Sequence, residues 1–311
     1  MLHDPPASLT APAALGAAPA APGRVPVRGV ALFLAVSCAV AWGAFGLIVI
    51  LGGLARPAAG LLLLLAMYGP ALGTLAARVW GEQPPPLLGV RRRGGWWPYL
   101  IAWLGPPLAL LLGAALAAGV GVQPFDPTLS RLRQTLEQQG GAVVPPPGAA
   151  TIALVASLML VGALLNSLAT FGEEVGWRGY LLAALAPLGG RRAALLVGLV
   201  WGLWHVPLIV QGWNYPGQPV LGSLLMVLFA LTWAVVFAWL RLWSGSVWPA
   251  VLGHGAINAA GSSLLALFPM DNPLLGAPVG LVVQVPGMLW AVWLLRSPVW
   301  DAAPRLSAPR A

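Results

Sequence analysis

The chain has 311 residues, of which 59% are apolar and only 8% are charged, and its mean hydropathy is +0.84. About a quarter of the residues in a soluble globular domain are charged, so this composition excludes the soluble classes and indicates a polytopic membrane protein. The net charge of +8 does not indicate a nucleic-acid partner, because the arginines lie beside the apolar segments rather than along one soluble face.

Residues 1–28 are rich in Ala and Pro and lack helical periodicity, so we expect a disordered cytoplasmic tail. The rest of the chain contains apolar segments of the roughly 20 residues that a helix needs to cross a bilayer core of about 30 Å. They lie near residues 29–54, 57–79, 96–121, 150–172, 193–212, 219–242, 246–268 and 275–295. We therefore predict an all-α, polytopic membrane bundle of about eight transmembrane helices over 29–296, followed by a cytoplasmic tail over 297–311.

The arginines are unevenly distributed between the loops. If the N-terminus is cytoplasmic, the outer side holds only Arg56, Arg131 and Arg133. The inner side then holds Arg24, Arg28, Arg91, Arg92, Arg93, Arg191, Arg192, Arg241, Arg296, Arg305 and Arg310. This asymmetry follows the excess of positive charge found in cytoplasmic loops. It predicts a multi-pass protein of the plasma (inner) membrane with both termini in the cytoplasm.

The outer loop over residues 122–149 contains the segment PFDPTLSRLRQTLEQQGG. Its mixture of apolar and charged residues predicts a short amphipathic helix on the membrane surface.

Three charged residues interrupt the apolar pattern in the segment FGEEVGWRGYLL. Glu174 and Arg178 are four residues apart, so on a helix they share a face and can pair. Glu173 points about 100° away without a local partner, which suits a general base or acid. The alternatives are a structural ion cluster, or charges solvated at a cytoplasmic helix end. The segment either extends the fourth span or forms a separate half-helix that ends at Gly189.

Two histidines lie in later apolar segments, His205 in WGLWHVPL and His254 in LGHGAIN. Pro207 removes a backbone donor just after His205, so a kink is predicted there. His254 and Asn258 are four residues apart and suit a pair of donors directed at one oxygen. Either motif alone is equally consistent with an interhelical hydrogen bond. Apart from His3, these are the only histidines in the chain, so their occurrence after the glutamates favours an active site.

The motifs Glu-Glu-x-x-x-Arg-Gly, Trp-His-x-Pro and His-x-x-x-Asn occur in this order between residues 150 and about 262. They resemble the signatures of the CPBP family of intramembrane proteases, also called the Abi or CAAX protease family, whose best-known eukaryotic member is type II CAAX prenyl endopeptidase. The resemblance implies a protease core at about 150–268. It also implies an endopeptidase that hydrolyses peptide bonds of membrane-associated or CAAX-like substrates in the lipid bilayer and needs no cofactor.

In that family pattern, Glu173 and His205 activate the attacking water, and His254 and Asn258 stabilise the oxyanion. Glu174 and Arg178 support the site. Trp201 is a departure, because the family more often has Phe four residues before this histidine. Since an aromatic ring is kept, we expect little consequence beyond the shape of the cavity.

Other functions use the same residues. Two histidines and a glutamate can bind zinc, although the chain lacks His-Glu-x-x-His, so a zinc-dependent metalloprotease ranks lower. Glu173, His205 and His254 could form a proton relay in a transporter. The lack of an obvious internal repeat disfavours that function. A third alternative is a non-catalytic membrane protein, of the immunity type, that binds a peptide without cutting it.

Overall fold

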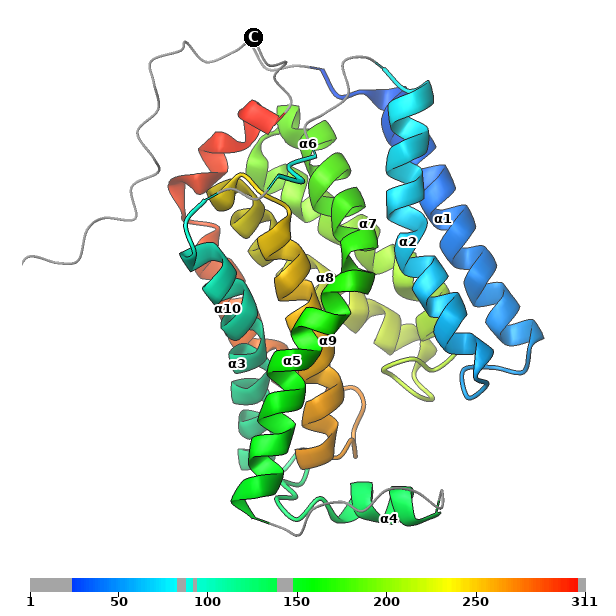
Figure 1. The fold of residues 1–311 in the computed structure, drawn as a ribbon, viewed down its shortest axis with the longest axis vertical. Coiled ribbons are helices and arrows are strands. Elements are labelled where there is room, and N and C mark those ends of the chain that lie inside the picture. Colours follow the sequence, from blue (N-terminus) through cyan, green and yellow to red (C-terminus); the bar gives the residue numbers. More distant parts are fainter. Residues whose placement is uncertain (1–23, 83–87, 92–93, 139–147, 307–311) are drawn as a thin grey trace, which may run out of the picture.

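The computed structural model describes residues 24–82, 88–91, 94–138 and 148–306. In these ranges the chain forms a bundle of helices without strands (Figure 1), which confirms the predicted all-α fold. The long helices are α1 (Val27–Ile50), α2 (Ala58–Trp80), α3 (Trp97–Gly119), α5 (Ala149–Glu174), α7 (Gly190–Ile209), α8 (Pro219–Ser244) and α9 (Trp248–Leu267). The shorter ones are α4 (Ser130–Gln138), η1 (Val175–Leu181), α6 (Leu182–Leu185), η2 (Ala186–Leu188), α10 (Leu281–Leu294) and η3 (Pro298–Leu306).

Seven helical segments are long and apolar enough to cross a membrane, and the fourth of them runs from α5 through to Leu188. The eighth predicted segment, residues 275–295, contains the shorter helix α10 of 14 residues. At 1.5 Å per residue α10 is about 21 Å long, less than a bilayer core. Its helix starts late because Gly276, Pro278 and Gly280 precede it, and these residue types disfavour helical backbone.

Consecutive long helices run in opposite directions, so the connections collect at two ends of the bundle (Figure 1). The start of α1, the α2–α3 connection, the start of α7, the end of α8 and η3 lie at one end. This end holds the predicted inner arginines that the structure describes, whereas Arg56, Arg131 and Arg133 lie at the other end. Arg92, Arg93 and Arg310 fall outside the described residues, as does most of the predicted N-terminal tail. The two ends of the described chain thus share one side of the bundle.

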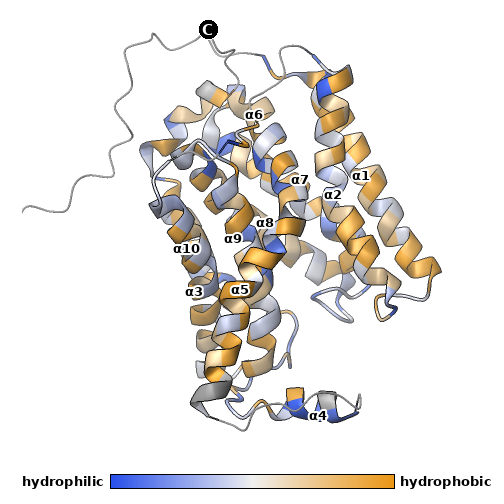
Figure 2. Cartoon of the chain, viewed as in Figure 1, coloured by the Kyte–Doolittle hydropathy of each residue, from blue (hydrophilic) through white to orange (hydrophobic). Residues whose placement is uncertain are grey.

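Apolar residues predominate along α1 and α2, as the orange colour shows in Figure 2, and many of the large apolar side chains are exposed. Leu61 of α2 is 74% exposed and Leu168 of α5 is 71% exposed. Large exposed apolar surfaces of this kind are unfavourable in water and favourable in lipid. The protein is therefore a multi-pass membrane protein whose outer surface contacts the bilayer.

Glycines allow several pairs of helices to approach closely. On α2, a Cβ at Gly69 would lie 2.9 Å from the Ser37 carbonyl oxygen of α1, and one at Gly73 would lie 2.6 Å from the Phe33 carbonyl oxygen. On α7, a Cβ at Gly202 would lie 2.6 Å from Val227 Cα of α8. Small residues spaced in this way bring helix backbones together where the hydrophobic effect supplies no force between helices.

The segment after α10 belongs partly to the folded bundle. Within the predicted tail 297–311, η3 buries Trp300, which is 1% exposed, and the indole of Trp300 donates a hydrogen bond to the Leu294 carbonyl oxygen at 2.8 Å. Arg191 at the start of α7 donates to the Leu295 carbonyl oxygen at 2.7 Å. Burial of an indole and these backbone contacts hold η3 against the helix ends.

The amphipathic helix predicted within residues 122–149 is α4. Asp126, just before it, accepts hydrogen bonds from the Thr128 hydroxyl at 2.6 Å and the Ser130 hydroxyl at 2.7 Å. Burial raises the pKa of Asp126, but the hydrogen bonds from Thr128 and Ser130 outweigh it and lower the pKa to about 2. The ionised carboxylate thus organises the turn that starts α4.

Gly73→Ala tests the close packing of α1 and α2. The added methyl group overlaps the α1 backbone, and overpacking of this kind costs about 1–3 kcal/mol. Gly46→Ala is the control, because nothing lies within 4 Å of a Cβ there and Ala favours a helix over Gly by about 1 kcal/mol. Thermal unfolding in detergent should show a lower Tm for Gly73→Ala and an equal or higher Tm for Gly46→Ala. Equal shifts in both variants would contradict this packing.

The Asp126 turn should depend on pH. Because the folded pKa is below the ordinary value of 3.8, its stabilisation is complete above that value and is lost as pH falls towards 2. Hydrogen exchange of the α4 amides, corrected for intrinsic rates, should therefore show weaker protection near pH 2 than near pH 5. Asp126→Asn should give weak protection at both values, and an unchanged pH dependence in that variant would refute the role of the carboxylate.

Candidate active site

The glutamate segment continues the fourth span. α5 ends at Glu174, and the chain proceeds directly into the π-helix η1, then α6 and η2, before Gly189 ends the helix with φ at +92°. All seven residues of η1 are buried. A Cβ on Gly176 would overlap Pro70 of α2, so glycine lets this wider turn pack against the neighbouring helix. π-turns inside α-helices occur frequently at functional sites.

Glu174 lies in a buried ion network. Its Oε1 accepts a hydrogen bond from Arg178 Nη1 at 2.7 Å and another from His254 Nδ1 at 2.9 Å. Glu174 and Arg178 are both 0% exposed, and the predicted pair between them is present. His254 joins them from α9, which the sequence alone did not reveal.

The Arg178 guanidinium lies between aromatic rings. Its Cζ is 4.4 Å from the centre of the Trp201 ring and 5.1 Å from that of Phe237. Within the described part of the chain, Nε and Nη2 of Arg178 make no hydrogen bond. The ring faces provide part of the compensation that a buried cation needs, because they are electron-rich.

Glu173 faces away from this network, as predicted, but it has partners. Its Oε2 accepts hydrogen bonds from the indole of Trp201 at 2.8 Å and the indole of Trp177 at 3.3 Å. Glu173 is 2% exposed. The prediction that it lacks a local partner is therefore wrong, because Trp177 is four residues away on the same helix face and carries an N–H donor.

His205 is oriented by the backbone of its own helix. Its Nδ1 lies 2.7 Å from the Trp201 carbonyl oxygen. A carbonyl can only accept, so this hydrogen bond assigns the proton to Nδ1 and leaves Nε2 of the neutral ring free to accept one. The ring packs edge-on against Trp204, with 4.8 Å between ring centres. His205 is only partly buried.

His254 and Asn258 project from α9 one turn apart. The His254 ring lies 5.1 Å from the Trp201 ring and 5.9 Å from the Phe237 ring, measured between centres. Asn258 is partly buried. α9 is held against α5 by a hydrogen bond of 2.9 Å from the Thr170 hydroxyl to the Val251 carbonyl oxygen.

Trp201 thus connects the site. Its indole N–H contacts Glu173, its carbonyl contacts His205, and its ring contacts Arg178 and His254. Residues from α5, η1, α7 and α9 meet around one side chain that is 1% exposed. Trp201 was expected only to shape the cavity, and Trp177 was missed, although its four-residue spacing from Glu173 is a signal that could have revealed it.

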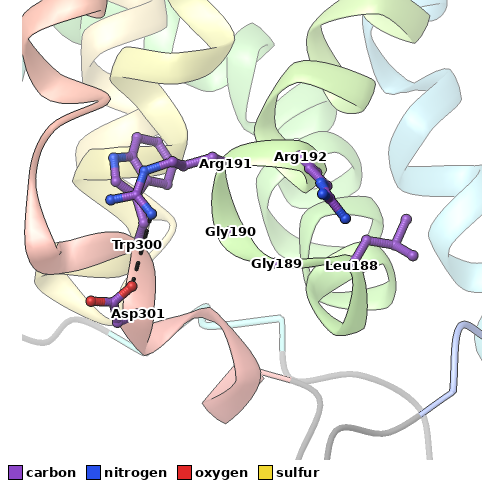
Figure 3. A pocket seen from close by; sticks show the side chains of 7 residues that line it. All are labelled: Leu188, Gly189, Gly190, Arg191, Arg192, Trp300 and Asp301. Atoms are coloured by element: carbon purple, nitrogen blue, oxygen red, sulfur yellow. Dashed lines mark ion pairs between the residues drawn. The ribbon is translucent and has the colours of Figure 1, made fainter.

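A separate pocket lies at the arginine-rich end of the bundle (Figure 3). It is lined by Leu188 to Arg192 at the start of α7 and by Trp300 and Asp301 of η3. Arg191 and Asp301 approach to 3.9 Å across it. None of the predicted site residues lines this pocket, so it belongs to the packing of η3 against α7.

The zinc alternative requires a set of metal ligands. In the described ranges, no group of three or more His, Cys, Asp or Glu side chains is arranged to hold a metal ion. Around Glu174 the partner atoms are those of an arginine and an imidazole, and a guanidinium does not bind metals.

Comparison with known proteins finds similarity over the segment that carries these residues. Residues 151–260 match the family model of "Type II CAAX prenyl endopeptidase Rce1-like". "CAAX prenyl protease 2" of Methanococcus maripaludis is 35% identical over 101 residues, which are 30% of this chain and 37% of that protein. The match thus spans little more than a third of the relative's length. All six predicted site residues lie in the segment matched by the family model, and this segment is similar to Rce1-like type II CAAX prenyl endopeptidases.

Proposed function

We propose that the protein is an intramembrane endopeptidase that hydrolyses a peptide bond of a membrane-associated, CAAX-like protein or peptide. The observation that carries the proposal is the meeting of Glu173, His205 and His254 around Trp201 inside an apolar bundle. Ionisable groups at this depth are costly and are usually functional. The family match over the same residues supports the reaction type.

The depth of the site supports a membrane-associated substrate. His205 lies about 22 Å along α7 from its start at Gly190, at 1.5 Å per residue. By the same measure His254 lies about 9 Å along α9 from its start at Trp248, so a substrate must bring its peptide bond between the membrane-spanning helices. A substrate chain that is anchored in the same membrane can place its peptide bond at this depth. In our proposal the arginine-rich end faces the cytoplasm, following the positive-inside rule.

In the first step, Glu173 and His205 act on a water molecule. In the described part of the chain no hydrogen bond reaches Oε1 of Glu173, while Oε2 is held by the two indoles. Oε1 takes a proton from the water, which His205 Nε2 orients, and the water oxygen bonds to the substrate carbonyl carbon. The carbonyl π-electrons move to its oxygen. General-base assistance of this kind contributes about 10²- to 10⁴-fold.

His254 and Asn258 stabilise the resulting oxyanion. His254 directs its Nδ1 proton to Glu174, so its Nε2 donates a hydrogen bond only when the ring is an imidazolium. In that state Glu173 and Glu174 are balanced by Arg178 and His254, which gives a neutral set of buried charges. The Asn258 amide supplies the second donor, and one such donor is worth about 2.7–4 kcal/mol.

The intermediate then collapses. Glu173 returns its proton to the substrate nitrogen, the carbon–nitrogen bond breaks, and the electron pair of that bond leaves with the amine. The products are a carboxylic acid and a free amine. Each proton and electron pair is accounted for without a cofactor, and the zinc mechanism is distinguished from this one by chelation.

Glu173→Gln should lower turnover about 10²- to 10⁴-fold, to a small residual rate, because the amide cannot take a proton from water. Purified wild-type protein in detergent should cleave peptides from a panel of lipid-anchored, CAAX-like C-terminal sequences, with chelator present or absent. Glu137→Gln is the matched control, since Glu137 is an exposed carboxylate on α4. Full activity of Glu173→Gln would remove the general-base assignment. Loss of wild-type activity on chelation, restored by zinc, would favour the metalloprotease. Binding of the peptides without cleavage would favour a non-catalytic role.

Arg178→Gln should lower both stability and activity, because Glu174 is then buried with one partner fewer. Breaking a buried ion pair costs about 3–5 kcal/mol. Thermal unfolding should show a clear drop for Arg178→Gln and little change for Arg56→Gln, an exposed arginine in the α1–α2 connection. Adding Glu174→Gln to Arg178→Gln should cost less than the sum of the single changes. Strict additivity would argue against the ion pair.

A further inference from the structure

The hydrogen bond between Trp201 and Glu173 is the shortest one that the described residues make to this carboxylate. It measures 2.8 Å from Nε1 to Oε2, whereas the bond from Trp177 to the same oxygen measures 3.3 Å. Trp201 is 1% exposed and Glu173 is 2% exposed. A charged acceptor removed from water depends on such donors, so the Trp201 bond carries most of this compensation.

The indole N–H groups of Trp177 and Trp201 both donate to Oε2 of Glu173, which fixes the orientation of the carboxylate. With Oε2 held, rotation of the carboxylate is restricted, and Oε1 is the oxygen to which no described residue donates a hydrogen bond. The indole that holds it is itself fixed, because the Arg178 guanidinium lies 4.4 Å from its ring centre and the His254 ring lies 5.1 Å away. Because the Trp201 ring is packed on its face and its N–H is hydrogen-bonded, the side chain cannot move easily, and Oε2 of Glu173 is held in place.

The same residue also orients the second water-activating group. The Trp201 carbonyl oxygen accepts the hydrogen bond from His205 Nδ1 at 2.7 Å. One turn of α7 therefore sets both Oε1 of Glu173 and Nε2 of His205 relative to each other. Phe at this position, which the resembling family more often has, would keep the ring and the carbonyl but would lack the N–H.

We propose that Trp201 is a positioning residue that aims Glu173 at the attacking water through its indole N–H, an inference that rests on the proposed peptidase function. From the sequence alone, the replacement of Phe by Trp201 was expected to change only the shape of the cavity. The structure gives the indole a partner that a phenyl ring cannot have.

Trp201→Phe tests the proposal because it removes the N–H and keeps an aromatic ring. We expect kcat to fall about 10- to 100-fold, since a misplacement of about 1 Å can cost 10²-fold, while KM changes less than about twofold. Trp300→Phe is the matched control. Trp300 is equally buried, and its indole makes a hydrogen bond of the same length, 2.8 Å, to a backbone carbonyl outside the site. An unchanged kcat in Trp201→Phe, or an equal fall in Trp300→Phe, would overturn the proposal.

A double-mutant comparison separates positioning from a structural role. In the Glu173→Gln background, Trp201→Phe should leave the residual rate unchanged, because the group it positions is already disabled. If the double variant loses the product of the two single rate losses, Trp201 affects the rate independently of Glu173 and the proposal fails. Retained activity in Glu173→Gln would instead refute the proposed function, so the two failures are distinguishable.

A spectroscopic measurement tests the contact without activity. The indole N–H resonance of Trp201, assigned by its loss in Trp201→Phe, should shift in Glu173→Gln, while that of Trp300 should not. No shift for Trp201 would overturn the contact on which the inference depends.

Discussion

The need to compensate buried charge governs this structure. Glu173, Glu174 and Arg178 lie within an apolar bundle and are almost completely inaccessible, and each ion removed from water costs several kcal/mol unless partners replace the water. Arg178 and His254 provide those partners for Glu174, and two indoles provide them for Glu173. The helices that carry these partners must therefore meet at one depth, where α9 packs against α5 and α7 contacts η1, the continuation of α5.

Small residues make that packing possible. Gly255 of α9 lies against Ala163 and Ser167 of α5, and Gly202 of α7 lies against α8. In lipid the hydrophobic effect does not drive helices together, so their association depends on close backbone contact and on hydrogen bonds between helices. The η1 turn then shifts the face of the fourth span just after Glu174, which keeps the whole segment buried against α2.

Much of this could be predicted from the sequence, and the exceptions have identifiable causes. Apolar length and helical spacing predicted the spans and the pairing of Glu174 with Arg178, because both depend on neighbours in the chain. The bond from Trp201 to Glu173 joins residues 28 positions apart and follows from how α7 packs, which no local pattern encodes. η3 was assigned to a tail because a single buried Trp300 in a short segment gives no periodic signal.

The two adjacent glutamates, Glu173 and Glu174, differ in the kind of hydrogen-bond donor that contacts each of them. Glu174 accepts hydrogen bonds from Arg178 and His254 on one oxygen, so it holds these two side chains in place. Among the described residues, the hydrogen-bond donors to Glu173 are two neutral indoles on one oxygen, so the other oxygen stays available to exchange a proton. Neutral donors can stabilise a carboxylate without forming an ion pair, and a carboxylate bound in an ion pair is a poor base. Tryptophan N–H donors thus hold Glu173 by hydrogen bonds rather than by a direct ion pair, which leaves Oε1 available for the proposed chemistry.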